Sequence, residues 1–340
     1  MSKIIVKNVT TGQELLWRSI KIKKSLDEIC HTLELEIPPS ERLKVGRHHR
    51  LEVRVANNLV KDSGGRRRVT TVLVDEITSS ADITKYSLMV IGRSPARDII
   101  DSTWSDTCSD MTLREITRYI GNKFNIVCDT FPPDKPDPTK LVYAFDWENE
   151  SPWTKLIGES DNQGYIFTSN EAGNLYLWKV DSGGRPEPFH ITEGVNVKNI
   201  RWTENGSEQF HEYIVTGGGY EVQEIDESCL GNRILTIDLT DTIIDEDRVK
   251  RRAKTEKKRR KENKITVTVP GWGLTDEQIK SMGETNEREI FWVPNILIPV
   301  SIPTLELNRN IELLISEVEY TATADAMNCD VTLVDREAYL

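Results

Sequence analysis

The stretch that decides the fold is the basic segment RVKRRAKTEKKRRKENK (248–264), which runs directly into ITVTVPGW (265–272). In 265–269 apolar and polar residues alternate, which is the period-two pattern of a half-buried β-strand. Proline then ends the pattern, because it has no N–H to donate to a strand ladder. The stretch therefore predicts a charged helix followed by a strand, and it carries no motif of catalytic machinery.

Charge is distributed unevenly along the 340 residues. The segment 248–264 holds eleven Lys or Arg against two Glu, a net charge of +9, so the total of −11 leaves −20 for the rest of the chain. An acidic body stays soluble and repels nucleic acid, whereas a basic helix can bind an acidic surface. The candidate interaction surface consists of Arg248, Lys250, Arg251, Arg252, Lys254, Lys257, Lys258, Arg259, Arg260 and Lys261.

Two interpretations of this surface stay open. The helix could pair with acidic protein surface, in this chain or on a neighbouring subunit, through contacts of about 0–1 kcal/mol each. Alternatively it could neutralise the phosphates of a nucleic acid. Aromatic residues for base stacking are absent from 248–264 and the rest of the chain is acidic, which favours the protein partner.

Tryptophan supplies a third possibility, because eight of them would also suit a carbohydrate-binding module. Most of them, however, fall within strand or helix patterns. Such positions favour a place in the core or at a subunit interface.

The bulk composition is that of a soluble globular protein with two or three domains, with 37% hydrophobic and 29% charged residues. No apolar run approaches the roughly 20 residues that span a bilayer. Residues 1–7 carry no secretion signal, so we expect synthesis and residence in a cytoplasm.

Catalytic and metal-binding motifs are missing. The five cysteines (Cys30, Cys108, Cys128, Cys229 and Cys329) are scattered without a Cys-x-x-Cys pair, which predicts packed thiols rather than disulfides or zinc. No histidine pair has metal-ligand spacing, and no Gly-x-Ser-x-Gly elbow is present. We therefore expect no catalytic, cofactor or metal site, and a protein that is not an enzyme.

Strand patterns occupy both ends of the chain. Alternation in 31–37 and 51–55, with further strands in 70–77 and 86–91, predicts a first β region, and strands return at Asn199–Thr203, 212–216, Ile234–Leu239, 311–323 and 330–334. In between, Thr112 and Glu115 predict a capping box, and Ser151-Pro152 predicts the start of a second helix. A hairpin is expected over the turn 171–174, and a short helix over 275–282.

The sequence thus predicts an α+β, β-rich fold with two barrel-like β domains and α/β modules between and inserted. The expected boundaries are 1–96 for the first barrel-like domain, 97–190 for an α/β domain, 191–235 with 290–340 for the second barrel-like domain, and 236–289 for an inserted α/β segment with the basic helix.

Read in order, a series of short segments resembles the central baseplate hub of Mu-type contractile phage tails, the family of 43-kDa tail proteins. The segments cover roughly residues 70–340. They are VIGRS (90–94), RDIIDS (97–102), the helix 113–126, ESPW (150–153), GYIF (164–167), GNL (173–175), YIVTG (213–217), the basic helix, VTVPGW (267–272), WVPN (292–295), LLI (313–315) and AY (338–339). The acidic run 283–289 departs from the family pattern.

The resemblance implies a structural protein of the virion tail baseplate, from a phage or prophage, assembled in the bacterial host cytoplasm. Its partners would be two further copies of itself, the spike protein, the tail tube and other baseplate proteins. Each chain of the homotrimer would contribute two barrel-like β domains to a six-fold-like ring. The ring would join the hexameric tube to the trimeric spike around an axial channel, through which DNA passes without sequence-specific binding.

Overall fold

The computed structural model describes residues 3–56, 66–81, 86–130, 139, 141–179, 189–239, 245–260, 263–274 and 291–339. Strands outnumber helices, and they gather in one large sheet and three small ones. The expected α+β, β-rich class is therefore confirmed. The helix expected over 275–282 lies outside the described residues.

The first β region forms what we call the N-terminal β unit, residues 3–93. It contains one short 3-10 helix, η1 (Pro39–Lys44), between its fourth and fifth strands. Its strands are β1 (Lys3–Asn8), β2 (Glu14–Leu15), β3 (Ser19–Ser25), β4 (Thr32–Ile37), β5 (Arg50–Ala56), β6 (Arg66–Ala81) and β7 (Tyr86–Arg93).

The C-terminal β unit is built from two separate stretches of chain, 189–203 and 264–339. Two short 3-10 helices belong to it, η3 (Pro303–Leu305) and η4 (Arg336–Tyr339). Its strands are β13 (Ile191–Thr192), β14 (Asn199–Thr203), β18 (Lys264–Pro270), β19 (Leu297–Ile302), β20 (Leu307–Thr323) and β21 (Met327–Val334).

The two β units repeat one topology. The strand order β1-β5-β6-β7-β4-β3 in the first corresponds to β13-β19-β20-β21-β18-β14 in the second, and the chain visits the strands in the same sequence. Each unit has one long strand that changes its partner halfway. The first half of β6 pairs with β5 and its second half with β7, and the first half of β20 pairs with β19 and its second half with β21. A register shift lies between the halves, at Val74/Glu76 in β6 and at Ile315/Glu317 in β20. One pairing differs, because β13 is parallel to β19 whereas β1 is antiparallel to β5.

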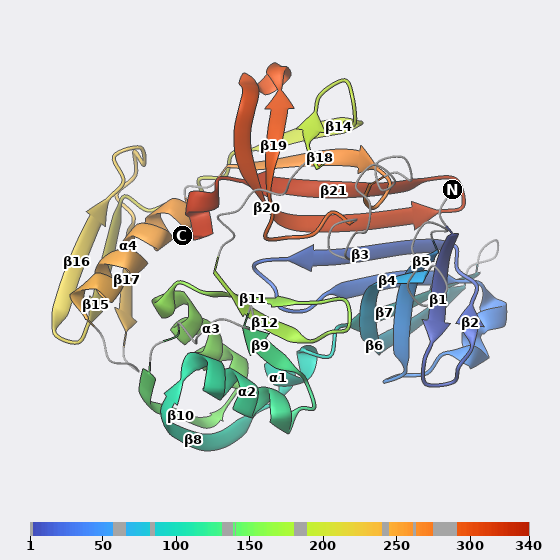
Figure 1. Cartoon of the computed structure of the whole chain (residues 1–340), viewed down its shortest axis with the longest axis horizontal. Helices are drawn as coiled ribbons and strands as arrows, with labels where there is room; N and C mark the ends of the chain where they lie inside the picture. Colours follow the sequence, from blue (N-terminus) through green and yellow to red (C-terminus); the bar gives the residue numbers. More distant parts are fainter. Residues whose placement is uncertain are drawn as a thin grey trace.

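The two β units join edge to edge along what we call the β3–β20 seam. Strand β3 pairs antiparallel with the second half of β20, from Glu317 opposite Ser25 to Thr323 opposite Ser19. This pairing merges the units into a single 13-stranded sheet, which runs across the upper part of the molecule from blue to red in Figure 1. Side chains from both units share one apolar core, including Ile22, Leu35, Val267 and Tyr320.

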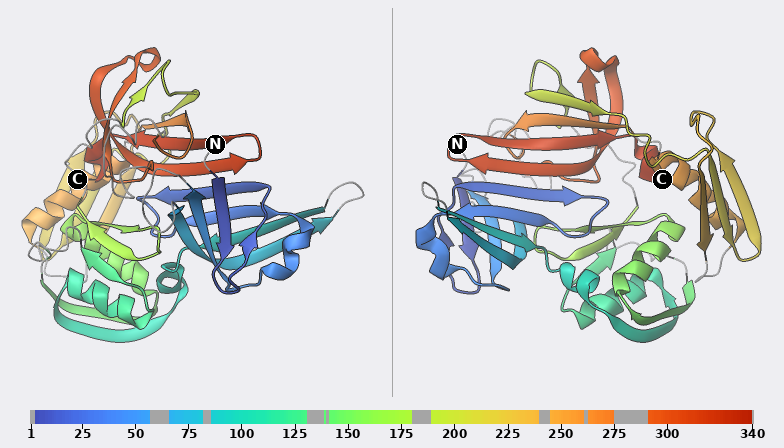
Figure 2. Two further views of the ribbon diagram at one scale, coloured as in Figure 1. Left: turned by 45° about the vertical axis from the view of Figure 1, so that its right-hand side comes forward. Right: turned by 180° about the vertical axis from the view of Figure 1, so that it is seen from behind.

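The large sheet is open among the described residues, with β14 at one end of the strand order and β2 at the other. A closed barrel is therefore not observed within either unit. Strand β14 (yellow-green) lies at the top of the molecule and β2 (blue) at one side, as the labels of Figure 1 and the colours of Figure 2 show.

The α/β unit, residues 97–179, lies below the large sheet in Figure 1. Its capping predictions are confirmed: Thr112 and Glu115 form a capping box at the start of α2, and Ser151 caps α3. Helix α3 ends at Gly164, which adopts a left-handed conformation with φ 72°. The elements are α1 (Arg97–Asp101), β8 (Trp104–Thr112), α2 (Leu113–Lys123), β9 (Cys128–Thr130), β10 (Leu141–Glu150), α3 (Pro152–Gln163), β11 (Ile166–Ser169) and β12 (Leu175–Trp178).

The helix–sheet unit, residues 205–260, contains β15 (Glu212–Gly217), β16 (Tyr220–Ile225), β17 (Ile234–Leu239) and α4 (Glu246–Arg260). Its three strands form a small sheet of their own, on which α4 lies. We expected β15 in the second β domain and the strand after the basic helix in the insertion. Instead, β15 pairs with β16 and β17, and β18 pairs with β14 and β21 in the large sheet. Strand periodicity predicts a strand but not its neighbour, so it could not separate the two sheets.

Candidate assembly interface

The basic helix begins two residues before the segment 248–264 and is described as far as Arg260, whereas Lys264 at the end of the segment already belongs to β18. A side-chain oxygen of Asp245 accepts a hydrogen bond from the backbone N–H of Arg248 at 2.8 Å, which caps the first turn. Val249 and Ala253 lie one turn apart and pack against the small sheet, where they are fully buried. This apolar stripe fixes the helix on its own sheet and sets the direction of every basic side chain.

Arg248 is the most buried of the nine candidate residues that the structure describes. Its guanidinium lies 3.8 Å from the carboxylate of Glu159 on α3, with side chains that are 3% and 2% exposed. Gln163 also donates to Glu159, at 2.5 Å. An ion pair shielded from water in this way is expensive to break, because removal of one partner leaves a buried charge unpaired.

A second contact between α4 and the α/β unit lies one turn further on. Arg252 contacts Asp161 at 2.9 Å and Glu256 of its own helix at 2.9 Å. Burial raises the pKa of the Asp161 carboxyl above its usual value, and the opposing effect of Arg252 is the smaller one. Arg252 therefore compensates only part of the cost of burying this carboxylate.

Near the end of α4, three units meet at Asp27. One carboxylate oxygen of Asp27 accepts hydrogen bonds from Arg259 at 2.8 Å and from the Tyr339 hydroxyl at 2.9 Å. The Arg259 guanidinium also lies over the Tyr339 ring, 5.6 Å from its centroid. Burial opposes the charge on Arg259, but Asp27 and Asp161 outweigh it and raise the pKa of this guanidinium.

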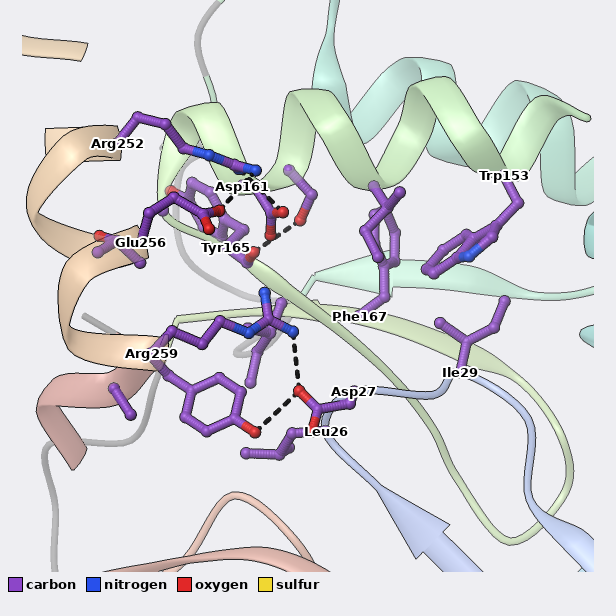
Figure 3. Close-up of a pocket in the computed structure, with 17 residues that line it drawn as sticks. Leu26, Asp27, Ile29, Trp153, Asp161, Tyr165, Phe167, Arg252, Glu256 and Arg259 are labelled. Carbon is purple, nitrogen blue, oxygen red and sulfur yellow. Dashed lines mark hydrogen bonds and ion pairs between the residues drawn. The ribbon is translucent and has the colours of Figure 1, made fainter. Parts of the chain in front are cut away.

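We call this region, where α4 meets the three other units, the α4 junction (Figure 3). It encloses a small cavity with an apolar wall and a charged wall. Leu26, Phe167 and Trp153 contribute to the former, and the latter holds Asp161 and Glu256 with the arginines of α4.

Six basic residues of α4 form ion pairs with carboxylates outside the helix. The pairs are Arg248–Glu159, Arg252–Asp161, Lys257–Glu224, Lys258–Glu337, Arg259–Asp27 and Arg260–Glu208. Pairing with acidic surface of this chain, one of the two interpretations of the helix, thus accounts for most of its charge. Sequence reasoning missed these partners, because carboxylates from five distant segments carry no common pattern.

The other four candidate residues are Lys250, Arg251, Lys254 and Lys261. Lys250 and Lys254 are exposed and lie on one side of α4 together with the exposed Lys258, at intervals of four residues, and Lys250 also pairs with Glu246 at 2.6 Å. Arg251 is half-buried and packs its side chain beside Gly164 at the end of α3. Lys261 lies outside the described residues.

Of the eight tryptophans, three are buried, four are half-buried and one is exposed. Trp147, Trp272 and Trp292 are buried, and the indole N–H of Trp272 donates to the Thr321 carbonyl at 3.0 Å. Core positions are thereby confirmed for these three. Trp202 on β14 differs, since it is 46% exposed.

The five cysteines are free thiols, and all except Cys229 are buried, as the scattered spacing predicts. Burial raises the pKa of the Cys30 thiol to about 11, which leaves it unreactive at neutral pH. In the part of the chain that the structure describes, no group of three or more His, Cys, Asp or Glu could hold a metal ion. Nor does any described helix have the length and apolar character needed to cross a membrane.

Comparison with known proteins places the fold among tail proteins. The 43 kDa tail protein of prophage MuSo2 from Shewanella oneidensis is 21% identical, with a TM-score of 0.78 over 99% of both chains. A tail protein from Neisseria meningitidis is 14% identical, with a TM-score of 0.76 over 98% of this chain and 96% of that one. A component of the E. coli type VI secretion system, described as similar to the T4 tail proteins gp27 and gp5, is 8% identical, with a TM-score of 0.58 over 97% of this chain and 76% of its own.

No family model matches the sequence, and a search of curated proteins found no match. The structural likenesses extend over the whole chain, so the fold expected from the resemblance to Mu-type tail proteins is confirmed.

Proposed function

We propose that this chain is a structural protein of a contractile phage-type tail, the homotrimeric central hub of the baseplate. In this role it joins the hexameric tail tube to the trimeric spike and surrounds an axial channel for DNA. The likeness to the MuSo2 tail protein over 99% of both chains supports the general role. The proposed place is the virion tail baseplate, after assembly in the host cytoplasm.

The observation that carries the proposal is the repeated topology of the two β units. One chain supplies two copies of the same six-stranded arrangement, already joined side by side at the β3–β20 seam. Three chains would supply six copies, which is the number needed to match a six-fold tube with a three-fold assembly. In such a ring each β unit would take its barrel-like form, and the exposed sheet edges would be covered.

We further propose that the four units are the domains of the protein, and that the α4 junction holds them in one fixed arrangement. The side of α4 with Lys250, Lys254 and Lys258 would then face an acidic neighbour in the baseplate. Because six basic residues of α4 are already paired with carboxylates of the chain, nucleic-acid binding by this helix is disfavoured.

DNA passage without tight binding agrees with the charge of the chain. Outside 248–264 the net charge is −20, which repels the phosphate backbone and would let DNA slide through a channel. The role is mechanical, so we propose no catalytic step.

The test is the solution mass of the purified protein, measured by light scattering after size exclusion at physiological salt. We expect three times the chain mass of 38.8 kDa, with dissociation on dilution. A trimer that also binds purified tube and spike proteins would support the hub. A protein that stays monomeric at high concentration, alone and with both partners, would overturn it.

A further inference from the structure

The repeated topology identifies one edge in each β unit at which the partner strand seen in the β3–β20 seam is missing among the described residues. Inside one chain, β3 of the first unit pairs with the second half of β20. The equivalent of β3 in the C-terminal β unit is β14. The equivalent of β20 in the N-terminal β unit is β6. Among the described residues neither of these edges is paired with another strand.

We propose that β14 of one copy pairs antiparallel with the second half of β6 of the next copy, and so repeats the β3–β20 seam between chains. The occupant of both edges is therefore a second copy of this protein. The number of copies rests on the proposed function, but the pairing itself rests on the topology alone.

The register follows from the pairing tables of the two units. In β6 and β7, Leu73 lies opposite Arg93, and in β20 and β21 Leu314 lies opposite Val334, so the second pair is the first displaced by 241 residues. In β3 and β4, Ile22 lies opposite Leu33, and in β14 and β18 Trp202 lies opposite Ile265. Leu33 also lies opposite Gly92 of β7, and Ile265 lies opposite Leu333 of β21, which is again displaced by 241 residues. Ile22 and Trp202 therefore occupy equivalent positions, 180 residues apart.

Applied to the β3–β20 seam, these displacements give residue partners across the contact between chains. The seam pair Tyr320 opposite Ile22 becomes Ser79 opposite Trp202, and Glu319 opposite Lys23 becomes Thr78 opposite Thr203. Two further pairs continue the ladder, Ser80 opposite Arg201 and Ala81 opposite Ile200.

Exposure of the equivalent side chains supports this assignment. Ile22 and Tyr320, in the seam, are fully buried at 0% exposure. Their counterparts Trp202 and Ser79 are exposed, and Trp202 reaches 46%. Trp202 is a large aromatic side chain at the position where the N-terminal β unit buries Ile22 completely. A partner strand that covers Trp202 explains its presence at this edge.

The side-chain chemistry of the two seams differs. On the outer face of the β3–β20 seam, Lys21 pairs with Glu319 at 3.0 Å and Lys23 with Glu317 at 3.1 Å. The same displacements turn these four positions into Arg201 and Thr203 on β14 and Glu76 and Thr78 on β6, so each strand keeps one charge and replaces the other by a threonine. Arg201 and Glu76 are exposed, while the threonine pair and the Trp202 side chain suit a contact that forms between folded subunits.

A disulfide test reads the register directly. The double variant T78C/T203C, in a C229S background, places two thiols opposite each other, with Cα atoms about 4.5–5.5 Å apart. After mild oxidation we expect disulfide-linked species that end at three chains, with loss of the bands on reduction. The matched control T78C/R201C sets the thiols on a diagonal of about 7–8 Å, beyond the reach of a disulfide, and the single variants lack a partner.

The outcomes separate this inference from the hub function. A trimeric mass without cross-linking of T78C/T203C, or with equal cross-linking of the diagonal control, overturns the pairing and leaves the hub in place. Cross-linked ladders that extend past three chains support the pairing and contradict a closed trimer. A chain that is monomeric and never cross-links overturns the pairing.

A second pair of variants tests the contact without new thiols. S79D places a carboxylate on the face that Trp202 would cover, whereas S80D places it on the opposite, outer face of the same strand. Both sites are exposed in the single chain, so both variants should fold. We expect S79D to raise the concentration at which the trimer dissociates by at least about tenfold, and S80D to change it much less. An equal effect of the two variants would contradict the proposed facing.

Discussion

Two of the contacts between the four units are of different kinds. The β3–β20 seam consists of seven successive residue pairs along two backbones over a shared apolar core. The α4 junction relies on four ion pairs between side chains that join α4 to the other units, Arg248–Glu159, Arg252–Asp161, Lys258–Glu337 and Arg259–Asp27. Backbone pairing does not depend on which side chains are present, so a seam can be repeated elsewhere with other residues. An ion-paired junction works only between its own partners.

The difference explains how one chain can combine variation with rigidity. Two β units that share almost no side-chain pairs can still present equivalent edges, because the strand order and register are the same. The helix–sheet unit has no strand in the large sheet, so its position depends on α4. Weakening the junction should therefore loosen one unit, whereas weakening the seam should affect the main core.

The largest effect is expected for the buried pair of the α4 junction. The variant R248M leaves the Glu159 carboxylate buried without its guanidinium, and we expect the free energy of unfolding to fall by about 3–5 kcal/mol. Urea titration followed by far-ultraviolet circular dichroism measures the change. The matched control K250M removes an exposed pair with Glu246 and should cost about 0.5 kcal/mol or less.

A rescue arm tests whether the buried negative charge of Glu159 is the cause. The double variant R248M/E159Q removes both charges, and the neutral amide that replaces the Glu159 carboxylate can still accept the hydrogen bond from Gln163. Recovery of a large part of the lost stability would show that the desolvated carboxylate is responsible. If the double variant is as unstable as R248M, the loss comes from packing of the arginine stem instead.

The next effect compares equivalent positions in the two β units. I22A removes a fully buried side chain at the seam and should destabilise the chain by about 2–5 kcal/mol. W202A, at the matching position of β14, should change the stability of the single chain by about 0.5 kcal/mol or less, because that edge is exposed. Unfolding titrations at equal, low protein concentration measure both. Similar losses for the two variants would mean that the Trp202 side chain on β14 is already packed in the single chain, so that β14 is not a free edge.

Much of this architecture is readable from the sequence, because strands and caps are encoded locally. Residues 199–203 and 234–239 are strands with the predicted bounds, and Thr112 caps its helix through Glu115 as the spacing indicates. What the sequence conceals is which strands pair. The topology repeats, yet Ile22 corresponds to Trp202 and Tyr320 to Ser79, so no similarity of residues marks the repeat.

The candidate site shows the same limit. The basic helix is conspicuous in the sequence, because eleven cationic residues lie within seventeen positions. Its partners are single carboxylates such as Asp27, Glu159 and Asp161, each unremarkable in its own segment. Long-range pairing of this kind depends on the tertiary fold, so only the charge asymmetry could be predicted.

The smallest effect concerns pH and a histidine beside the seam. His31 is buried, its Nδ1 lies 3.2 Å from the Thr70 hydroxyl, and burial together with the nearby Lys24 lowers its pKa well below 6.5. In the unfolded chain the imidazole takes up a proton near pH 6.5, while in the folded chain it stays neutral. Stability is therefore lost as the pH falls below about 6.5, by on the order of 1 kcal/mol from this residue at pH 5.5. We expect the variant H31Q, which keeps a hydrogen-bonding group, to lose less stability than the parent between pH 7.5 and pH 5.5. If H31Q and the parent lose equal stability between the two pH values, His31 takes up its proton in the folded chain as readily as in the unfolded one, and the seam tolerates the charge.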